Sequence, residues 1–274
     1  MSLASKATTK KNEHGFSILD TRQWRDNQWQ NIADKVVDEV PVALVYNGIS
    51  HAVMMATPCD LTDFAIGFSL TEEIIDNTDQ IYDLQIEQHT QGYEIALSIS
   101  AEKMQRLKKI KRNIAGNTGC GLCGIDSLDA MNRKGKTVKA AAMPSAQAIA
   151  FAVHSLDSWQ TIQQQTGACH AAAWCNLDGE KILIREDVGR HNAFDKLIGA
   201  MAKEKIKSTE GFALISSRAS YEMVHKASFL QCANLVAVSA PTSMAIEQAI
   251  QLNINLIGFA RNDKFNVYHC ANTN

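Results

Sequence analysis

The chain has 274 residues, of which 46% are hydrophobic, so it can form one large domain or two ordinary domains that share an interface. Its formal net charge of −2 excludes a general polycation for nucleic acid, and no apolar run approaches the length of a membrane span. Aromatic residues make up only 7%, which favours α/β or α+β layers over an all-β sandwich.

The first fifteen residues are polar and lack the apolar segment that a secretory signal needs, so we expect a loose tail. The chain has seven cysteines, an odd number. We therefore expect reduced thiols and a cytoplasmic protein rather than a disulfide frame. Cys175 and Cys232 stand among apolar residues and are expected to fill the core.

Residues 17–115 are predicted to form a smaller N-terminal α+β domain. Asn47-Gly48 is a strong turn dipeptide between apolar stretches and predicts a hairpin of residues 42–47 and 51–56. Thr62 is expected to cap a helix that runs to Ile75. A second strand pair is expected at 81–88 and 93–100, followed by a helix over 102–112 with a basic face.

Residues 116–144 break this periodicity and are expected to form a loop or linker. Glycine, which tolerates unusual backbone angles, is concentrated around it at positions 116, 119, 121, 124 and 135. Loops of this length inside compact proteins usually carry function.

Residues 145–274 are predicted to form an α/β domain. A helix capped by Ser145 is expected to run to about Gln165 and to precede a hairpin about Asp178-Gly179. The remaining expected elements are a helix over 191–203, a strand over 212–216, a helix over 220–230, a strand over 235–239, a helix over 242–251 and a strand over 255–259. Strands linked by helices should be parallel, which gives a three-layer sandwich.

The glycine-rich loop holds a Cys-x-x-Cys pair, Cys120 and Cys123. Such a pair binds zinc with two further ligands, cycles as a dithiol, or carries a persulfide. No second ligand pair has zinc spacing, and a thioredoxin-type pair would begin a helix after a strand. A thiolate on a flexible arm fits best, favoured by the preceding basic run over 103–112. A Cys-x-x-Cys pair alone is weak, and incidental cysteines remain an alternative.

Polar residues also gather where the later strands are expected to end. Arg190, Arg218 and Arg261 each follow one of these strands and precede or approach a helix start. Open α/β sheets bind ligands at such ends, where free helix N–H groups favour anions. The pattern predicts a pocket for a phosphorylated ligand, and ordinary caps with surface ion pairs are the alternative.

With these residues in view, the sequence resembles the FdhD/NarQ family of formate dehydrogenase accessory sulfur carriers. The resemblance rests on Cys-Gly-x-Cys-Gly in the loop and on four later segments: Glu186–Lys196, Arg218 to Ala227, Ser239–Thr242 and Gly258-Phe259-x-Arg261. The chain departs from the family pattern at Asn117-Thr118-Gly119, where a serine run is common, and at Gln231–Asn234.

This resemblance implies a sulfur carrier, a sulfurtransferase-type protein with a cysteine persulfide intermediate. It would accept sulfur from a cysteine desulfurase and pass it to the bis(molybdopterin guanine dinucleotide) molybdenum cofactor for formate dehydrogenase. Cys120 matches the family's persulfide position, and Cys123 belongs to the same candidate site. The implied cofactor-binding residues are Phe259, Ala260, Arg261, Asn262, Asp263 and Lys264, to which we add Arg218 and His191. GDP is expected to mimic the cofactor.

The resemblance also implies a homodimer and a cytidine-deaminase-like C-terminal domain. A zinc deaminase needs His-x-Glu at one helix start and Pro-Cys-x-x-Cys at the next. The corresponding starts here are His191-Asn192-Ala193 and the segment 217–220, which lack the glutamate and both cysteines. We therefore expect no metal site. A zinc-dependent nucleotide deaminase or hydrolase and a non-catalytic cofactor chaperone remain the alternative functions.

Overall fold

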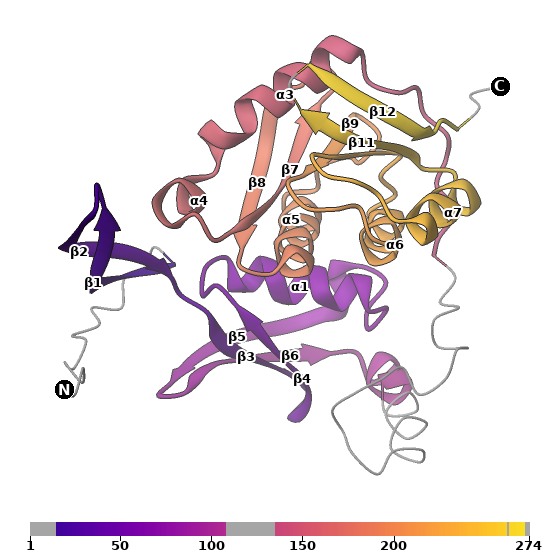
Figure 1. The fold of residues 1–274 in the computed structure, drawn as a ribbon. Coiled ribbons are helices and arrows are strands. Elements are labelled where there is room, and N and C mark those ends of the chain that lie inside the picture. Colours follow the sequence, from indigo (N-terminus) through magenta and orange to yellow (C-terminus); the bar gives the residue numbers. More distant parts are fainter. Residues whose placement is uncertain (1–14, 108–134, 262, 272–274) are drawn as a thin grey trace.

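The computed structural model describes residues 15–107, 135–261 and 263–271. Two sheets dominate it, a four-stranded sheet from the first part of the chain and a six-stranded sheet from the second. Figure 1 shows them with helices between and outside them. The predicted fold class is confirmed: the protein is mixed α+β, with a three-layer α/β arrangement in its second half.

A two-stranded antiparallel ribbon comes first and was not predicted. It consists of β1 (Phe16–Arg25) and β2 (Gln28–Val37), joined by Asp26 and Asn27 with φ of 51° and 58°. Positive φ at both central residues is the geometry of the tight hairpin turn. Most of its side chains are exposed, so the apolar alternation that marks a half-buried strand is missing from the sequence.

The four-stranded sheet has the order β4-β3-β6-β5. Its strands are β3 (Val40–Tyr46), β4 (Ile49–Ala56), β5 (Ile81–His89, after the short η1 helix Thr78–Gln80) and β6 (Gly92–Ile99). Both predicted strand pairs are confirmed, and Asn47 and Gly48 have the positive φ that the hairpin turn requires. A helical segment follows over residues 101–107.

Helix α1 (Leu61–Thr71) covers one face of this sheet and differs from its predicted bounds. Thr62 does not cap it: the N-cap is Asp60, in the left-handed region, with no side-chain capping bond. The helix also ends before Ile75, because Glu73 adopts a φ of 56°. Ile74 and Ile75 are instead buried in the core between α1 and the sheet.

The six-stranded sheet has the order β12-β11-β10-β9-β7-β8. The elements of this half are α3 (Ala146–Trp159), α4 (Thr161–Thr166), β7 (His170–Asn176), β8 (Lys181–Asp187), α5 (Arg190–Glu204), β9 (Gly211–Ile215), α6 (Tyr221–Phe229), β10 (Asn234–Ala237), α7 (Ser243–Leu252), β11 (Asn255–Arg261) and β12 (Lys264–His269). The predicted parallel pairing holds for β9, β10 and β11. Strand β12 and the break between α3 and α4 were not predicted.

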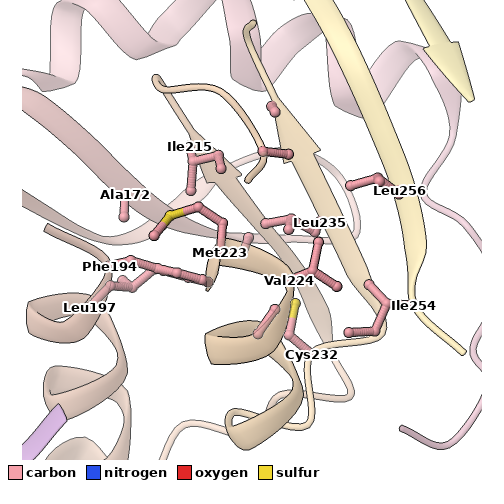
Figure 2. Close-up of a cluster of buried hydrophobic side chains, with 14 of the residues drawn as sticks. Ala172, Phe194, Leu197, Ile215, Met223, Val224, Cys232, Leu235, Ile254 and Leu256 are labelled. Atoms are coloured by element: carbon pink, nitrogen blue, oxygen red, sulfur yellow. The ribbon is translucent and has the colours of Figure 1, made fainter. Parts of the chain in front are cut away.

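Helices cover both faces of this sheet. Side chains of α5, α6 and α7 pack on one face; Figure 2 shows part of that core, with Phe194 and Leu197 of α5 and Met223 of α6 near strand residues such as Ile215. Helix α3 packs on the other face through Ile149, Ala152 and Leu156. The predicted core positions Cys175 and Cys232 are fully buried.

The two halves meet where α1 crosses α5 (Figure 1). Gly67 of α1 and Gly199 of α5 mark the crossing: a Cβ added at Gly67 would lie 1.8 Å from the Asp195 carbonyl oxygen, and one at Gly199 would lie 1.8 Å from that of Asp63. Only glycine permits the two helix backbones to approach this closely. The contact fixes the first half of the chain against the helix that leads away from β8.

Candidate functional site

The candidate site is one edge of the six-stranded sheet. Strand β8 runs parallel to β9, because β7 is antiparallel to both, so β8, β9, β10 and β11 all end on this edge. Helices α5, α6 and α7 begin there, each after one of these strands. Three helix N-termini with free N–H groups give the edge a positive potential. The predicted gathering of strand ends is therefore present.

Backbone hydrogen bonds join the loops of this edge. The Val238 N–H donates to Ile215 O at 3.0 Å, the Thr242 N–H to Ala219 O at 3.0 Å, and the Phe259 N–H to Ser239 O at 3.1 Å. The loops after β9 and β10 and the end of β11 consequently keep fixed positions relative to one another. Such rigidity favours a binding site, since little ordering is required when a ligand arrives.

His191 opens α5 and contacts Glu222 in the first turn of α6. The hydrogen bond from His191 holds the pKa of Glu222 below its ordinary value, against the opposing effect of partial burial. His170, at the start of β7, has a lowered pKa because of desolvation and the nearby Arg190. The sequence predicted His191 as a site residue but not Glu222, because a contact between the first turns of two different helices has no local signal in the sequence.

Arg190 Nε and Ser220 Oγ are among the buried polar atoms of this edge that have no hydrogen-bond partner within the described part of the chain. Ser220 is the N-cap of α6, but its side chain makes no capping bond. Buried polar groups are normally satisfied, so such atoms are available to a ligand at this edge. Arg218, in the loop between β9 and α6, is exposed.

The predicted cofactor segment lies at the end of β11 and the start of β12. Phe259 has a φ of 52°, a backbone conformation that is strained for an aromatic residue. The Arg261 guanidinium lies 5.9 Å from the centre of the Phe259 ring, and Arg261 is exposed. Asp263 pairs with His154 of α3 at 2.9 Å. Ala260 is buried and Lys264 is exposed, whereas Asn262 lies outside the described residues.

Five charged side chains of the predicted anion-binding junction at 185–196 are engaged within the protein, those of Arg185, Glu186, Asp187, Asp195 and Lys196. Lys196 pairs with Asp187 at 2.7 Å, and both side chains are fully buried. The Glu186 carboxylate accepts from the backbone N–H groups of Ile162 and Gln163, at the start of α4, at 2.9 and 2.8 Å. These side chains stabilise the fold and are not free to bind an anion, whereas Arg190 and His191, at the turn that opens α5, are half-buried.

The Cys-x-x-Cys pair, Cys120 and Cys123, lies outside the described residues, as do the cations at 108–112. The two described cations of the basic run are already paired. Lys103 is buried and contacts Asp76, and Arg106 contacts Glu73 at 3.2 Å. The expected basic helix face is thus wrong for Lys103, because the acidic residues after α1 neutralise it.

The buried cysteines are poor nucleophiles. Burial raises the pKa of Cys169 and of Cys175 to about 12, and that of Cys232 to about 11. The pKa of Cys59 is raised as well, again through burial. At neutral pH these thiols are protonated, and the thiolate is the reactive form.

Within the described ranges, no three histidine, cysteine, aspartate or glutamate side chains come together as metal ligands. Among the same residues, no helix is long and apolar enough to cross a membrane.

The three-layer arrangement, with α5, α6 and α7 each beginning after a strand that ends at one edge of the sheet, places the second half of the chain in the open α/β class. The chain belongs to the FdhD/NarQ family, whose model matches residues 37–273. It is 48% identical over 252 residues to "Sulfur carrier protein FdhD" of Cupriavidus necator, covering 92% of this chain and 88% of that protein.

A second relative supports this assignment, and a solved structure supports the fold. A protein of the same name from Xanthomonas euvesicatoria is 43% identical over 254 residues, covering 93% of this chain and 90% of the relative. A crystal structure from Desulfotalea psychrophila, described as a candidate formate dehydrogenase accessory protein, superposes with a TM-score of 0.72 at 20% identity. It covers 93% of this chain and 97% of the other, and at that identity it supports the fold alone.

Proposed function

We propose that this protein is a sulfur carrier for formate dehydrogenase. It accepts sulfur from a cysteine desulfurase on Cys120 and delivers it to the bis(molybdopterin guanine dinucleotide) molybdenum cofactor, its cargo. The observation that carries the proposal is the extensive identity with relatives named as sulfur carriers, across nine-tenths of the chain. Four of the five described cysteines do not compete for this role, because burial raises their pKa values; the fifth, Cys270, is exposed.

The sulfur enters by thiol exchange. The Cys120 thiolate attacks the terminal sulfur of the desulfurase persulfide, a sulfur–sulfur bond forms on Cys120, and the desulfurase cysteine leaves as a thiolate. The product persulfide has the oxidation state of a disulfide and is reversible by thiols. The exchange requires a reduced thiolate, so we propose that it takes place in the cytoplasm.

The cargo binds at the strand edge. Helix N-termini and arginines are the groups that proteins use for diphosphates, and the edge has both. We assign Arg218, His191 and the segment 259–264 to this site, with the strained Phe259 and its stacked Arg261 at its centre. GDP, which has the diphosphate and the base of the cargo, is the simplest probe. We propose that the protein acts as a homodimer.

The sulfur-carrier role is tested by complementation in cells that lack their own copy of this protein. Cys120→Ala should abolish formate dehydrogenase activity while the variant folds normally and binds GDP as the wild type does. Cys270→Ala, which removes an exposed thiol from the described part of the chain, is the matched control and should complement fully. Full activity with Cys120→Ala would reject the carrier role and favour a chaperone.

The cargo site is tested separately by calorimetry with GDP. Arg261→Ala should weaken binding about tenfold, the scale of one charge-assisted hydrogen bond. Lys181→Ala is the control, because Lys181 is an exposed cation at the start of β8, the opposite end from the candidate edge. Equal GDP affinity in Arg261→Ala and wild type would reject the assignment of this segment.

A further inference from the structure

The end of β4 and the residues after it hold the turn that opens α5. Four hydrogen bonds run from Met55 and Thr57 to this turn and to Lys196. The Thr57 N–H donates to Asp187 Oδ2 at 3.0 Å, and the Val188 N–H donates to Thr57 Oγ1 at 3.1 Å. Lys196 Nζ donates to Thr57 O at 2.9 Å, and Asn192 Nδ2 donates to Met55 O at 2.8 Å.

These hydrogen bonds hold the chain on both sides of Arg190 and His191. Asp187 also accepts from the Gly189 N–H at 2.8 Å and from Asn192 Nδ2 at 3.0 Å. The chain is therefore fixed before and after the turn that presents Arg190 and His191. Both Thr57 and Asp187 are fully buried, so their hydrogen bonds do not exchange with water, and losing one leaves an unsatisfied group.

We infer that Thr57 is a positioning residue for the ligand edge: its hydroxyl and backbone hold the β8–α5 turn so that Arg190 and His191 meet the cargo. This inference rests on the proposed function, which supplies the identity of the ligand. It places part of the binding machinery in the first half of the chain, which supplies no strand to the six-stranded sheet. Thr57 itself is buried and does not touch the cargo.

A second buried cluster between the two halves provides a comparison. Thr71 of α1 donates to Asp195 Oδ1 at 2.8 Å and accepts from Lys226 Nζ at 2.9 Å. Like Thr57, it is a buried threonine that hydrogen-bonds residues of the second half. Its partners lie inside α5 and α6, beyond the β8–α5 turn. Removing its hydroxyl should loosen the contact between the halves without moving Arg190.

The test uses the full chain and calorimetry with GDP. Thr57→Val removes the acceptor of the Val188 N–H at constant shape, and should weaken GDP binding about three- to tenfold, as the loss of one buried hydrogen bond implies. Thr57→Ser keeps the hydroxyl and should restore affinity to within about twofold of wild type, and Thr71→Val should also stay within about twofold. Hydrogen exchange of the Val188 amide should quicken only in Thr57→Val.

If Thr57→Val does not fold, Asn192→Ala is the second variant. It removes the hydrogen bonds that the Asn192 side chain donates to Met55 and Asp187. It should weaken GDP binding by a similar factor. Unchanged GDP affinity in the folded variant would overturn the positioning role and leave the cargo site intact. An equal loss in Thr71→Val would also overturn it, since the effect would then be general destabilisation. A wild-type protein that binds no GDP would instead reject the cargo assignment, and this inference with it.

Discussion

The ammonium group of Lys196 lies 2.7 Å from the Asp187 carboxylate, and neither side chain has any exposed surface. The pair joins the last residue of β8 to the middle of α5, and Lys196 also donates to the Thr57 carbonyl. A charge buried this completely is tolerated only because its partner and its hydrogen bonds are in place.

Removing one member of this pair should therefore be costly. Asp187→Asn leaves Lys196 buried without a counter-charge and should lower the free energy of unfolding by about 3–5 kcal/mol. The double variant Asp187→Asn/Lys196→Met should recover part of that loss, because the two effects are not additive for residues in contact. Chemical denaturation of the wild type, the two single variants Asp187→Asn and Lys196→Met, and the double variant measures the losses and their additivity. Additive losses would show that the two charges do not stabilise one another.

The helix crossing should tolerate no side chain. Gly67→Ala and Gly199→Ala each place a Cβ 1.8 Å from a backbone carbonyl oxygen of the partner helix, so α1 and α5 must separate. We expect each variant to unfold at a clearly lower temperature and the two halves to lose their cooperative melting. Gly48→Ala is the control: its Cβ meets open space, and only its positive φ opposes the change, at about 1 kcal/mol. Equal losses at Gly48 and Gly67 would contradict the close crossing.

Several elements were predictable because their signals are local. Asn47-Gly48 located the first hairpin, and Ser145 located the start of α3, where its side chain accepts from a helix N–H group as predicted. The helix predicted over 242–251 is α7, and Thr242 is its N-cap. The β1–β2 ribbon and β12 were not predicted, because their residues are largely exposed and show no clean apolar alternation. Strand periodicity is visible only where one face is buried.

The residues of the candidate site also fall into those that the sequence could predict and those that it could not. Residues at strand ends, such as Arg218 and His191, could be selected from the order of elements along the chain. Glu222 and Thr57 could not, because their roles depend on contacts between distant segments: the Thr57–Asp187 hydrogen bond spans 130 residues. Polar residues of the 185–196 segment predicted a ligand site, yet Glu186, Asp187 and Lys196 proved to be partners of other protein groups.

The His191–Glu222 contact predicts a pH dependence. The pKa of Glu222 is lowered from 4.5, chiefly by the hydrogen bond from His191, so the folded state holds the Glu222 proton less tightly than the unfolded chain does. The contact therefore contributes stability above about pH 4.5 and loses it as the pH falls through the lowered pKa. His191→Ala should return the pKa of Glu222 toward 4.5 in a carbon-13 NMR titration. An unchanged Glu222 titration in that variant would show that His191 is not the cause.

The buried thiols should not react with an alkylating reagent in the native protein. Because burial raises the pKa values of Cys169, Cys175 and Cys232 to about 12, about 12 and about 11, iodoacetamide at neutral pH should label none of them before unfolding and all of them afterwards. Peptide mass spectrometry gives the labelling of each cysteine, with exposed Cys270 as the positive control. Fast native labelling of Cys175 would contradict its place between the sheet and α3.

Whether Cys120 carries the sulfur can be measured by peptide mass spectrometry after incubation of the protein with a cysteine desulfurase and cysteine. The peptide containing Cys120 should gain the mass of one sulfur atom, dithiothreitol should remove it, and Cys120→Ala should gain none. The buried cysteines, measured in the same digest, should remain unmodified. A wild-type protein that acquires no added sulfur at Cys120, or a Cys120→Ala variant that acquires as much as the wild type, would show that Cys120 is not the carrier.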